Sequence, residues 1–308
     1  MTSAKRRAAI PKGSAALPGT VVASYGQRGV VELATGRQAR YLLKGRQLRA
    51  VCGDSVSCAP QTGSSELLLT AVLPRRNSLQ RPNGRGRTEV LAANIDRVVV
   101  VTAAEPAADY FLVDRFLCAA ELMGAAGVIV VNKVDLRIPA DTELSEYATL
   151  GYPVVHASAL AASGMRELEA TLRTGTSILV GQSGVGKSSL VNKLVPAAAV
   201  LTSELSAGTG EGRHTTTASH MHTLAGGGRL IDSPGVREYA PVIDEAARVQ
   251  NGFREILRLA DTCRFANCQH TREPNCAVKD AVTSGLISAR RYASYKRLRN
   301  MQAAAGPH

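Results

Sequence analysis

Apolar residues recur in two different patterns along the chain. In the first quarter they form short runs separated by glycine-containing turns, which predict strands at 20–25, 29–33, 39–43, 54–59 and 67–73. Five short strands at this spacing, without a helix-length period, favour a small β-barrel of the OB type.

The pattern changes beyond residue 94. Continuous apolar runs predict buried strands at 95–101, 127–131, 154–155, 177–180 and 229–231, and amphipathic stretches predict helices at 109–123, 141–150, 164–173 and 187–195. Alternating strands and helices are typical of an α/β domain whose parallel sheet is covered by helices on both faces. A helix, a cysteine cluster and a basic helix at 289–301 follow.

These patterns divide the chain into five expected segments. They are a basic flexible tail (1–16), an OB-fold barrel (17–74), an arginine-rich linker (75–90), an α/β domain (91–245) and a helical metal-binding domain (246–308).

Charge narrows the class of partner. The 37 Lys and Arg residues outnumber 25 Asp and Glu, which leaves a formal net charge of +12. A charge of this size predicts a polyanionic partner, either nucleic acid or an anionic membrane surface. No apolar run approaches the ~20 residues of a membrane span, and the basic N-terminus lacks the apolar region of a secretory signal. We therefore expect a cytoplasmic, monomeric protein that does not bind membranes.

Residues 181–188 read GQSGVGKS and fit the phosphate-binding pattern G-x-x-x-x-G-K-[ST]. A predicted strand precedes this P-loop and a predicted helix follows it, which is the context the pattern needs. Lys187 would reach the β- and γ-phosphates, and the Ser188 hydroxyl would ligate Mg²⁺. The expected phosphate-side residues are Gly181, Gln182, Ser183, Gly184, Val185, Gly186, Lys187, Ser188 and Ser189.

A second phosphate-side motif follows the last predicted strand, where residues 232–235 read DSPG. Asp232 stands at the carboxyl end of that strand, where an acidic residue beside a P-loop holds Mg²⁺. The backbone N–H of Gly235 would sense a γ-phosphate.

The sequence also contains a candidate base-reading site. Asn132, Lys133 and Asp135 form an N-K-x-D loop directly after a strand, at the edge where α/β folds bind ligands. The Asp135 carboxylate can accept two hydrogen bonds from guanine, whereas adenine lacks that pair of donors. Asn132 would tether neighbouring loops, and Ser158 with Ala159 resembles the second guanine loop.

The guanine loops precede the P-loop, the reverse of the order in ordinary small GTPases. Together with residues 74–78 (PRRNS), 93–96 (ANID), 212–217 (GRHTTT) and 232–238 (DSPGVRE), this permuted order resembles the ribosome small-subunit-dependent GTPase family, RsgA or YjeQ. The resemblance implies that 91–245 is a circularly permuted GTPase domain. It also implies a bacterial enzyme that hydrolyses GTP and acts late in assembly of the small ribosomal subunit, which stimulates its turnover.

The catalytic residues are only partly defined. Val236 stands where Ras-like enzymes carry a water-orienting Gln, so slow intrinsic hydrolysis is expected. His214 is the candidate that positions water, although an ordinary loop histidine explains it equally well. The resemblance favours Thr216 as a Mg²⁺ ligand and leaves Thr215 and Thr217 open. The expected catalytic set is Lys187, His214, Thr216 and Gly235.

Cys263, Cys268, His270 and Cys276 lie within fourteen residues. Three thiols and an imidazole predict a closed, structural Zn²⁺ site, and the zinc motif of the similar family matches at all four positions. The other cysteines are expected in the core and are Cys52, Cys58 and Cys118.

Basic residues gather in the barrel, the linker and the last helix, which favours RNA binding. Tyr292 and Tyr295 interleave with the basic residues of that helix and could stack on unpaired bases. The candidate RNA contacts are Arg28, Arg40, Lys44, Arg75, Arg76, Arg291 and Lys296.

The leading hypothesis is a GTPase of small-subunit assembly that uses GTP, Mg²⁺ and one Zn²⁺ and contacts ribosomal RNA. One alternative is a nucleotide-sensing RNA-binding module with little turnover, which Val236 would explain. Another is a P-loop kinase or ATPase acting on a metabolite, which Asp135 opposes.

Overall fold

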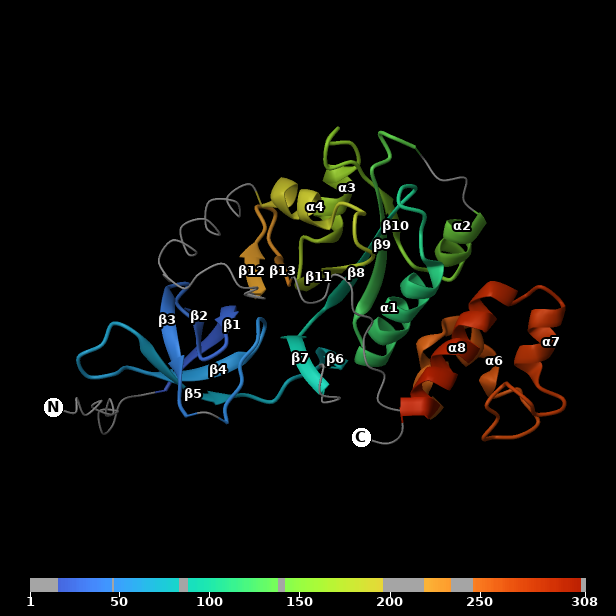
Figure 1. Cartoon of the computed structure of the whole chain (residues 1–308), viewed down its shortest axis with the longest axis horizontal. Coiled ribbons are helices and arrows are strands. Elements are labelled where there is room, and N and C mark those ends of the chain that lie inside the picture. The colour runs from blue at the N-terminus through green and yellow to red at the C-terminus, as the bar shows by residue number, and fades with distance from the viewer. Residues whose placement is uncertain are drawn as a thin grey trace.

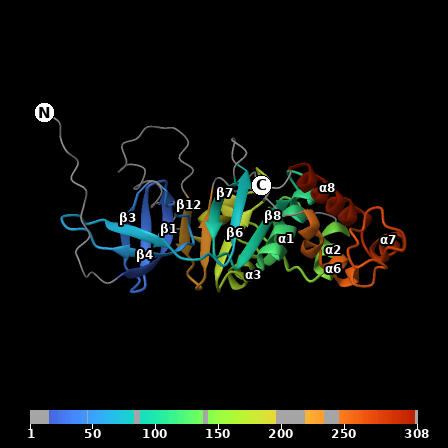
Figure 2. The same ribbon diagram turned by 90° about the horizontal axis from the view of Figure 1, so that it is seen from below.

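The computed structural model describes residues 16–45, 47–82, 88–137, 142–195, 219–233 and 246–305. A barrel and a C-terminal helical unit lie at opposite ends of the long axis, with an α/β unit between them (Figures 1 and 2). His214, the threonines 215–217, Gly235 and Val236 lie outside the described residues, as does the predicted tail up to residue 15.

The barrel has five strands, as predicted. They are β1 (Leu17–Tyr25), β2 (Arg28–Leu33), β3 (Gln38–Leu43), β4 (Ser55–Ala59) and β5 (Leu67–Val72). β1 pairs with both β2 and β4, and β3 runs parallel to β5, so the sheet closes on itself. Alternate side chains such as Val31, Tyr41 and Leu69 fill its interior and are fully buried, which agrees with the period of two in these strands.

The central unit contains the predicted parallel sheet. Its strands are β8 (Arg97–Ala103), β9 (Ala126–Asn132), β10 (Val154–His156), β11 (Thr176–Val180) and β13 (Arg229–Asp232), in the order β10-β9-β8-β11-β13. The helices are α1 (Tyr110–Met123), α2 (Thr142–Thr149), α3 (Met165–Thr171) and α4 (Lys187–Leu194). Val98 and Val100 pack on the face of α1 and α2, and Val99 and Val101 pack on the face of α3 and α4. Both faces are covered, which explains the continuous apolar runs.

One strand of this sheet was not predicted. β12 (Ser219–Thr223) reads SHMHT and lies antiparallel to β13 on one side and to β1 on the other. It therefore joins the barrel and the parallel strands into one eleven-stranded sheet. With a single large apolar residue, Met221, the sequence of β12 lacks the apolar pattern by which strands are recognised.

Part of the predicted linker is also regular structure. β6 (Ser78–Pro82) and β7 (Thr88–Ala93) form a two-stranded antiparallel ribbon. Leu79 and Ala92 are buried in the core beside α1. The Asn77 amide accepts from the N–H of Ile95 at 2.8 Å and donates to its carbonyl at 2.8 Å. The segment is thus packed against the central unit.

The C-terminal unit contains a 3₁₀ helix, η2 (Ala246–Gly252), and the helices α6 (Arg254–Ala260), α7 (Ala277–Thr283) and α8 (Ala289–Ala305). α7 was not among the predicted helices. The core of the C-terminal unit includes Phe253, Ile256 and Leu298, together with Cys118 of α1. Cys118, like Cys52 and Cys58, is fully buried, which confirms the core role predicted for these thiols. Among the helices in the described part of the chain, none is both long and apolar enough to cross a membrane.

A buried ion network fixes α8 to the central unit. Arg291 donates to Asp114 of α1 at 2.7 Å and to both carboxylate oxygens of Glu255 at 2.7 and 2.9 Å. Arg290 bridges Asp114 and Glu146, each at 2.9 Å. Burial by itself would lower the pKa of Arg291, but Asp114 and Glu255 outweigh it and raise that pKa above its usual value.

The prediction that Arg291 contacts RNA is therefore wrong, because only 1% of its side chain is exposed. A basic residue in a basic helix looks the same in the sequence whether it faces solvent or a buried carboxylate on another element.

We expect Arg291→Met to lower the free energy of unfolding by about 3–5 kcal/mol, because it leaves Asp114 and Glu255 without their buried partner. Lys296→Ala, on the exposed face of the same helix, should change it by less than about 1 kcal/mol. Urea denaturation of the two variants measures the difference. Equal, small losses in both would show that the network does not stabilise the fold.

Candidate functional site

The P-loop connects β11 to α4. Gly181, Gly184 and Gly186 have φ of 131°, 81° and 90°, in the region that favours glycine. At Gly181 a Cβ would come within 2.2 Å of the Val101 carbonyl oxygen. Lys187 begins α4, and its Nζ donates to the Gly181 and Gln182 carbonyls at 2.7 and 2.5 Å. The loop thus has the backbone that lets N–H groups surround a phosphate. Its solvent-facing residues are Ser183, Gly184, Ser188 and Ser189.

Asn132, the last residue of β9, joins three loops. Its Nδ2 donates to the Val185 carbonyl of the P-loop at 2.9 Å. Its Oδ1 accepts from the Ala159 N–H at 3.3 Å. Gly186 passes so close that a Cβ there would lie 2.3 Å from Nδ2. The N-K-x-D loop, the loop at 158–159 and the P-loop are therefore contiguous, and Asn132 is the tether that the sequence analysis expects.

Asp135 is exposed, and its position is fixed by Ser158. The Ser158 hydroxyl donates to Oδ1 of Asp135 and accepts from the Ala161 N–H at 2.9 Å. Ser158 itself is fully buried. A buried hydroxyl thereby orients an exposed carboxylate, which can accept from a planar base that carries two adjacent donors.

Lys133 contacts a residue that the sequence analysis overlooked. Its Nζ donates to the Glu105 carbonyl at 3.0 Å, in the loop that follows β8. The carboxyl ends of neighbouring parallel strands lie at the same edge of a sheet. The position of Glu105 just after β8 was therefore the sequence feature that could have placed it near the site. The long stem of Lys133 therefore runs between the two loops, where it can cover the plane of a base.

Two of the three candidate Mg²⁺ ligands come from strands that end at this edge: Ser188 follows β11, and Asp232 is the last residue of β13. β11 and β13 are parallel neighbours, with Ile178 opposite Ile231, so the P-loop and Asp232 leave the sheet on the same side. Ser188 supplies a hydroxyl and Asp232 a carboxylate, the hard oxygen donors that Mg²⁺ requires. Thr216, His214 and Gly235 lie outside the described residues.

The four metal-site residues converge. The ligand atoms of Cys263, Cys268, His270 and Cys276 all lie within 4.8 Å of one another. His270 Nδ1 is 3.5 Å from the Sγ atoms of both Cys263 and Cys276. Three sulfurs and one imidazole nitrogen suit a tetrahedral, thiophilic cation. The cluster can therefore hold a metal ion.

Glu273 supports the metal loop from within and was not predicted. Its carboxylate accepts backbone hydrogen bonds from Gln269, Thr271 and Arg272 at 3.1, 3.0 and 3.0 Å. Desolvation opposes ionisation, but these donors prevail and lower the pKa of Glu273 to about 2. The ionised carboxylate thus shapes the turn at physiological pH.

Two tyrosines of α8 hold the same loop. Tyr292 Oη donates to the His270 carbonyl at 2.6 Å, and Tyr295 Oη donates to the Gln269 carbonyl at 2.8 Å. Tyr295 is 1% exposed. The stacking role suggested for it is therefore wrong, and both rings connect the metal loop to α8.

Apart from Arg291, six candidate RNA contacts remain. Five are exposed, namely Arg28, Arg40, Lys44, Arg76 and Lys296. Two of the six are paired with a carboxylate: Arg75 makes two hydrogen bonds, at 2.7 and 2.9 Å, with the buried Asp54, and Arg76 lies 2.6 Å from Asp96. The Arg75 charge is therefore already matched within the fold.

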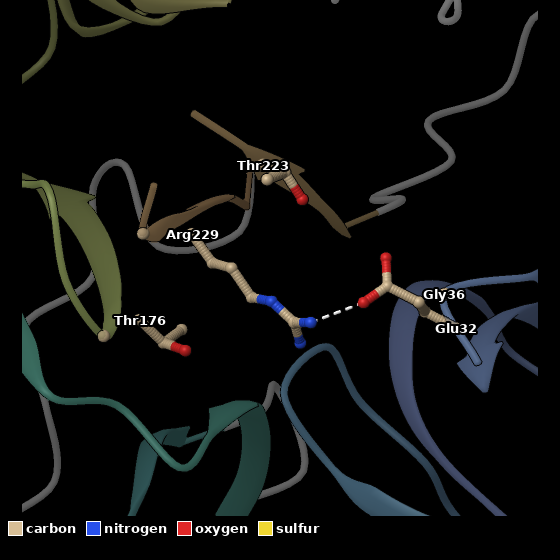
Figure 3. A pocket seen from close by; sticks show the side chains of 7 residues that line it. Glu32, Gly36, Thr176, Thr223 and Arg229 are labelled. Carbon is tan, nitrogen blue, oxygen red and sulfur yellow. Dashed lines mark hydrogen bonds and ion pairs between the residues drawn. The ribbon is translucent and has the colours of Figure 1, made fainter. Parts of the chain in front are cut away.

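A pocket lies between the barrel and the central sheet (Figure 3). Arg229 crosses it to pair with Glu32 of β2, and Thr176 and Thr223 line it. Thr176 and Arg229 are the first residues of β11 and β13, so the pocket is at the opposite edge of the sheet from the P-loop. It is separate from the nucleotide site.

Comparisons with known proteins agree with this geometry. A model of the RsgA GTPase family matches residues 72–241. The small ribosomal subunit biogenesis GTPase RsgA of Pseudomonas aeruginosa PAO1 is 41% identical over 286 residues, which cover 91% of this chain and 84% of that protein. Its counterpart in Azotobacter vinelandii is 42% identical over 291 residues, with the same coverage.

Two solved structures share the fold. YjeQ from Thermotoga maritima superposes with a TM-score of 0.70 and 28% identity over 94% of this chain and 99% of its own. YloQ, described as a circularly permuted GTPase, gives a TM-score of 0.71 at 24% identity, over 98% of this chain and 100% of its own. The permuted arrangement of P-loop and guanine loops, the barrel and the Cys/His cluster thus occur in a chain that belongs to the RsgA GTPase family.

Proposed function

We propose that this protein is a GTPase that acts in biogenesis of the small ribosomal subunit, the role named for its relatives. The observation that carries the proposal is the Asn132 junction, where one buried amide binds the P-loop and the second guanine loop together. A base held at Asp135 and phosphates held at Lys187 would then belong to one nucleotide.

The chain's residues divide the work of binding and hydrolysis. Asp135, oriented by Ser158, selects guanine, and the Lys133 stem covers the base. The P-loop N–H groups and Lys187 bind the phosphates. Ser188 and Asp232 would hold Mg²⁺, and the ion would supply positive charge opposite the phosphate oxygens. Three further residues lie outside the described part of the chain and remain proposals. Thr216 would bind Mg²⁺, the Gly235 N–H would sense the γ-phosphate, and His214 would position the attacking water.

Turnover by the isolated chain should be slow. Val236 cannot hydrogen-bond to water, so the attacking water needs another group, from His214 or from the partner. We propose that the small subunit supplies or positions that group. The alternative is a nucleotide sensor with little turnover, and it rests on the same valine. It differs because the small subunit would not raise its rate of GTP hydrolysis.

The surface of this protein that faces the partner is basic, and the partner that it fits is RNA. Arg28, Arg40 and Lys44 are exposed on the barrel and Lys296 is exposed on α8, and each can neutralise a backbone phosphate. Arg76 is also accessible, although Asp96 shares its charge. A net charge of +12 repels other copies and fits a cytoplasmic monomer.

The Cys/His cluster holds one structural Zn²⁺. Four protein ligands complete a tetrahedral shell and leave no coordination position for chemistry. Cys263, Cys268, His270 and Cys276 are the ligands, with His270 binding through Nδ1, the nitrogen that faces the sulfurs.

Asp135→Asn should weaken GTP binding about 10- to 100-fold, because an amide cannot accept both guanine donors, and should improve binding of xanthosine triphosphate. Equilibrium binding of both nucleotides measures the change. Asp261→Asn, an exposed position in the C-terminal unit, is the matched control. If Asp135→Asn binds both nucleotides as the wild type does, the base does not lie at Asp135.

Purified small subunits should raise the steady-state GTPase rate, and the stimulation should fade as salt rises because released counterions drive phosphate contacts. Arg40→Ala and Lys44→Ala should each reduce the salt dependence of subunit binding by about one unit of slope, with the intrinsic rate unchanged. A slow rate that subunits leave unaltered would favour the sensor alternative.

Strong chelation should expose three thiols to a thiol-specific reagent, because Cys263, Cys268 and Cys276 lose the metal ion that they bind together. Cys52, Cys58 and Cys118 should stay protected, since they are fully buried and burial raises the pKa of Cys52 to about 12. Elemental analysis before chelation should give one Zn²⁺ per chain. Thiol reactivity that is the same with and without chelator would contradict a metal-held loop.

A further inference from the structure

β12 connects the barrel to the strand that carries Asp232. On one side His220 lies opposite Asp232 of β13, and on the other His220 and Ser219 lie opposite Ala23 and Ser24 of β1. The Tyr25 ring also packs edge-on against His220, with centroids 5.5 Å apart. Figure 1 shows this strand between the barrel and β13. Only one strand therefore separates the barrel from the candidate Mg²⁺ carboxylate.

Cys52 fixes the first residue of β12 to the barrel. Its Sγ donates to the Ser219 carbonyl at 3.0 Å and lies 3.5 Å from the Val22 carbonyl oxygen. Burial raises the pKa of this thiol to about 12, so it stays protonated and able to donate at physiological pH. Cys52 lies in a turn packed closely against the end of β7: its carbonyl accepts from the Ala93 N–H at 3.0 Å, and a Cβ at Gly53 would lie 2.0 Å from the Ala93 carbonyl oxygen.

Ser219 is also hydrogen-bonded to the residue that follows β13. Ser219 Oγ donates to Ser233 Oγ at 2.7 Å. Ser233 is 3% exposed and directly follows Asp232. A chain of two hydrogen bonds therefore runs from Cys52 through Ser219 to Ser233, the residue next to Asp232.

The far end of the β12–β13 hairpin is held as well. Arg229, the first residue of β13, pairs with Glu32 of β2 across the pocket shown in Figure 3. The hairpin is thus attached to the barrel at both ends, by an ion pair near its turn and by Cys52 near Asp232.

We propose that the barrel positions Asp232 through Cys52 and Ser219, which are positioning residues for Mg²⁺ at the nucleotide site. This inference rests on the proposed function, in which Asp232 holds the ion. Coupling of this kind is reciprocal: a ligand that shifts the barrel changes the affinity for Mg²⁺–nucleotide, and the bound nucleotide changes the affinity of the barrel for its partner.

The test measures how Mg²⁺ affects the binding of a fluorescent GTP analogue, in excess chelator and across a Mg²⁺ titration. Cys52→Ala and Ser219→Ala should each raise the Mg²⁺ concentration for half-maximal effect about three- to tenfold, the effect of losing one hydrogen bond. Affinity without Mg²⁺ should stay within about twofold of the wild type, because the P-loop and guanine loops are unchanged. Cys58→Ala removes an equally buried thiol from β4 in the barrel core and should leave both quantities as they are.

Two results would overturn the inference. One is a Mg²⁺ dependence in Cys52→Ala and Ser219→Ala that matches that of Cys58→Ala. The other is an equal loss of affinity with and without Mg²⁺, which indicates general destabilisation. If Cys52→Ala does not fold, Ser219→Ala alone decides between these outcomes. A wild-type chain that binds no GTP would instead reject the proposed function, and the inference with it.

Discussion

Asn132 belongs to the N-K-x-D loop, and its side-chain amide forms one hydrogen bond with the P-loop and one with the loop at 158–159. It therefore joins the three loops of the candidate nucleotide site. Because it is 2% exposed, those two bonds must be made within the protein, which fixes the spacing of the loops. The loops predicted to bind the base and the phosphates are 53 residues apart in the chain, measured from Asn132 to Val185. They lie together because β9, β8 and β11 are consecutive in the sheet. Permutation changes the order of the loops along the chain and leaves their order in the sheet unaltered.

The two flanking units attach to the central unit in different ways. The C-terminal unit docks through buried charges, with Arg291 between Asp114 and Glu255. Tyr292 and Tyr295 of the same helix α8 donate hydrogen bonds to the metal loop. One helix therefore contacts both the metal loop and α1. Such a network stabilises the interface only while every member is present.

The barrel attaches through backbone pairing instead. β1 is shared between the closed barrel and the extended sheet, since it pairs with β2, β4 and β12. A sheet transmits displacement along its hydrogen-bonded ladder more directly than a flexible linker does. The exposed Arg28 and Arg40 of the barrel therefore belong to the same continuous sheet as the strand that carries Asp232, and the exposed Lys44 directly follows β3 of that sheet.

The sequence by itself determined the parts that depend on local geometry. The P-loop, the N-K-x-D loop and the Cys/His spacing each fit within fourteen residues, and the barrel and parallel strands followed from apolar periodicity, so family membership could be inferred and the comparisons confirmed it. Only the tertiary structure decided the rest. β12 has too few apolar residues to be recognised and becomes a strand because β1 and β13 pair with it. Arg291 and Tyr295 looked like surface residues because their partners, Asp114 and Gln269, lie far away in the sequence, and burial is set by such partners rather than by neighbours along the chain.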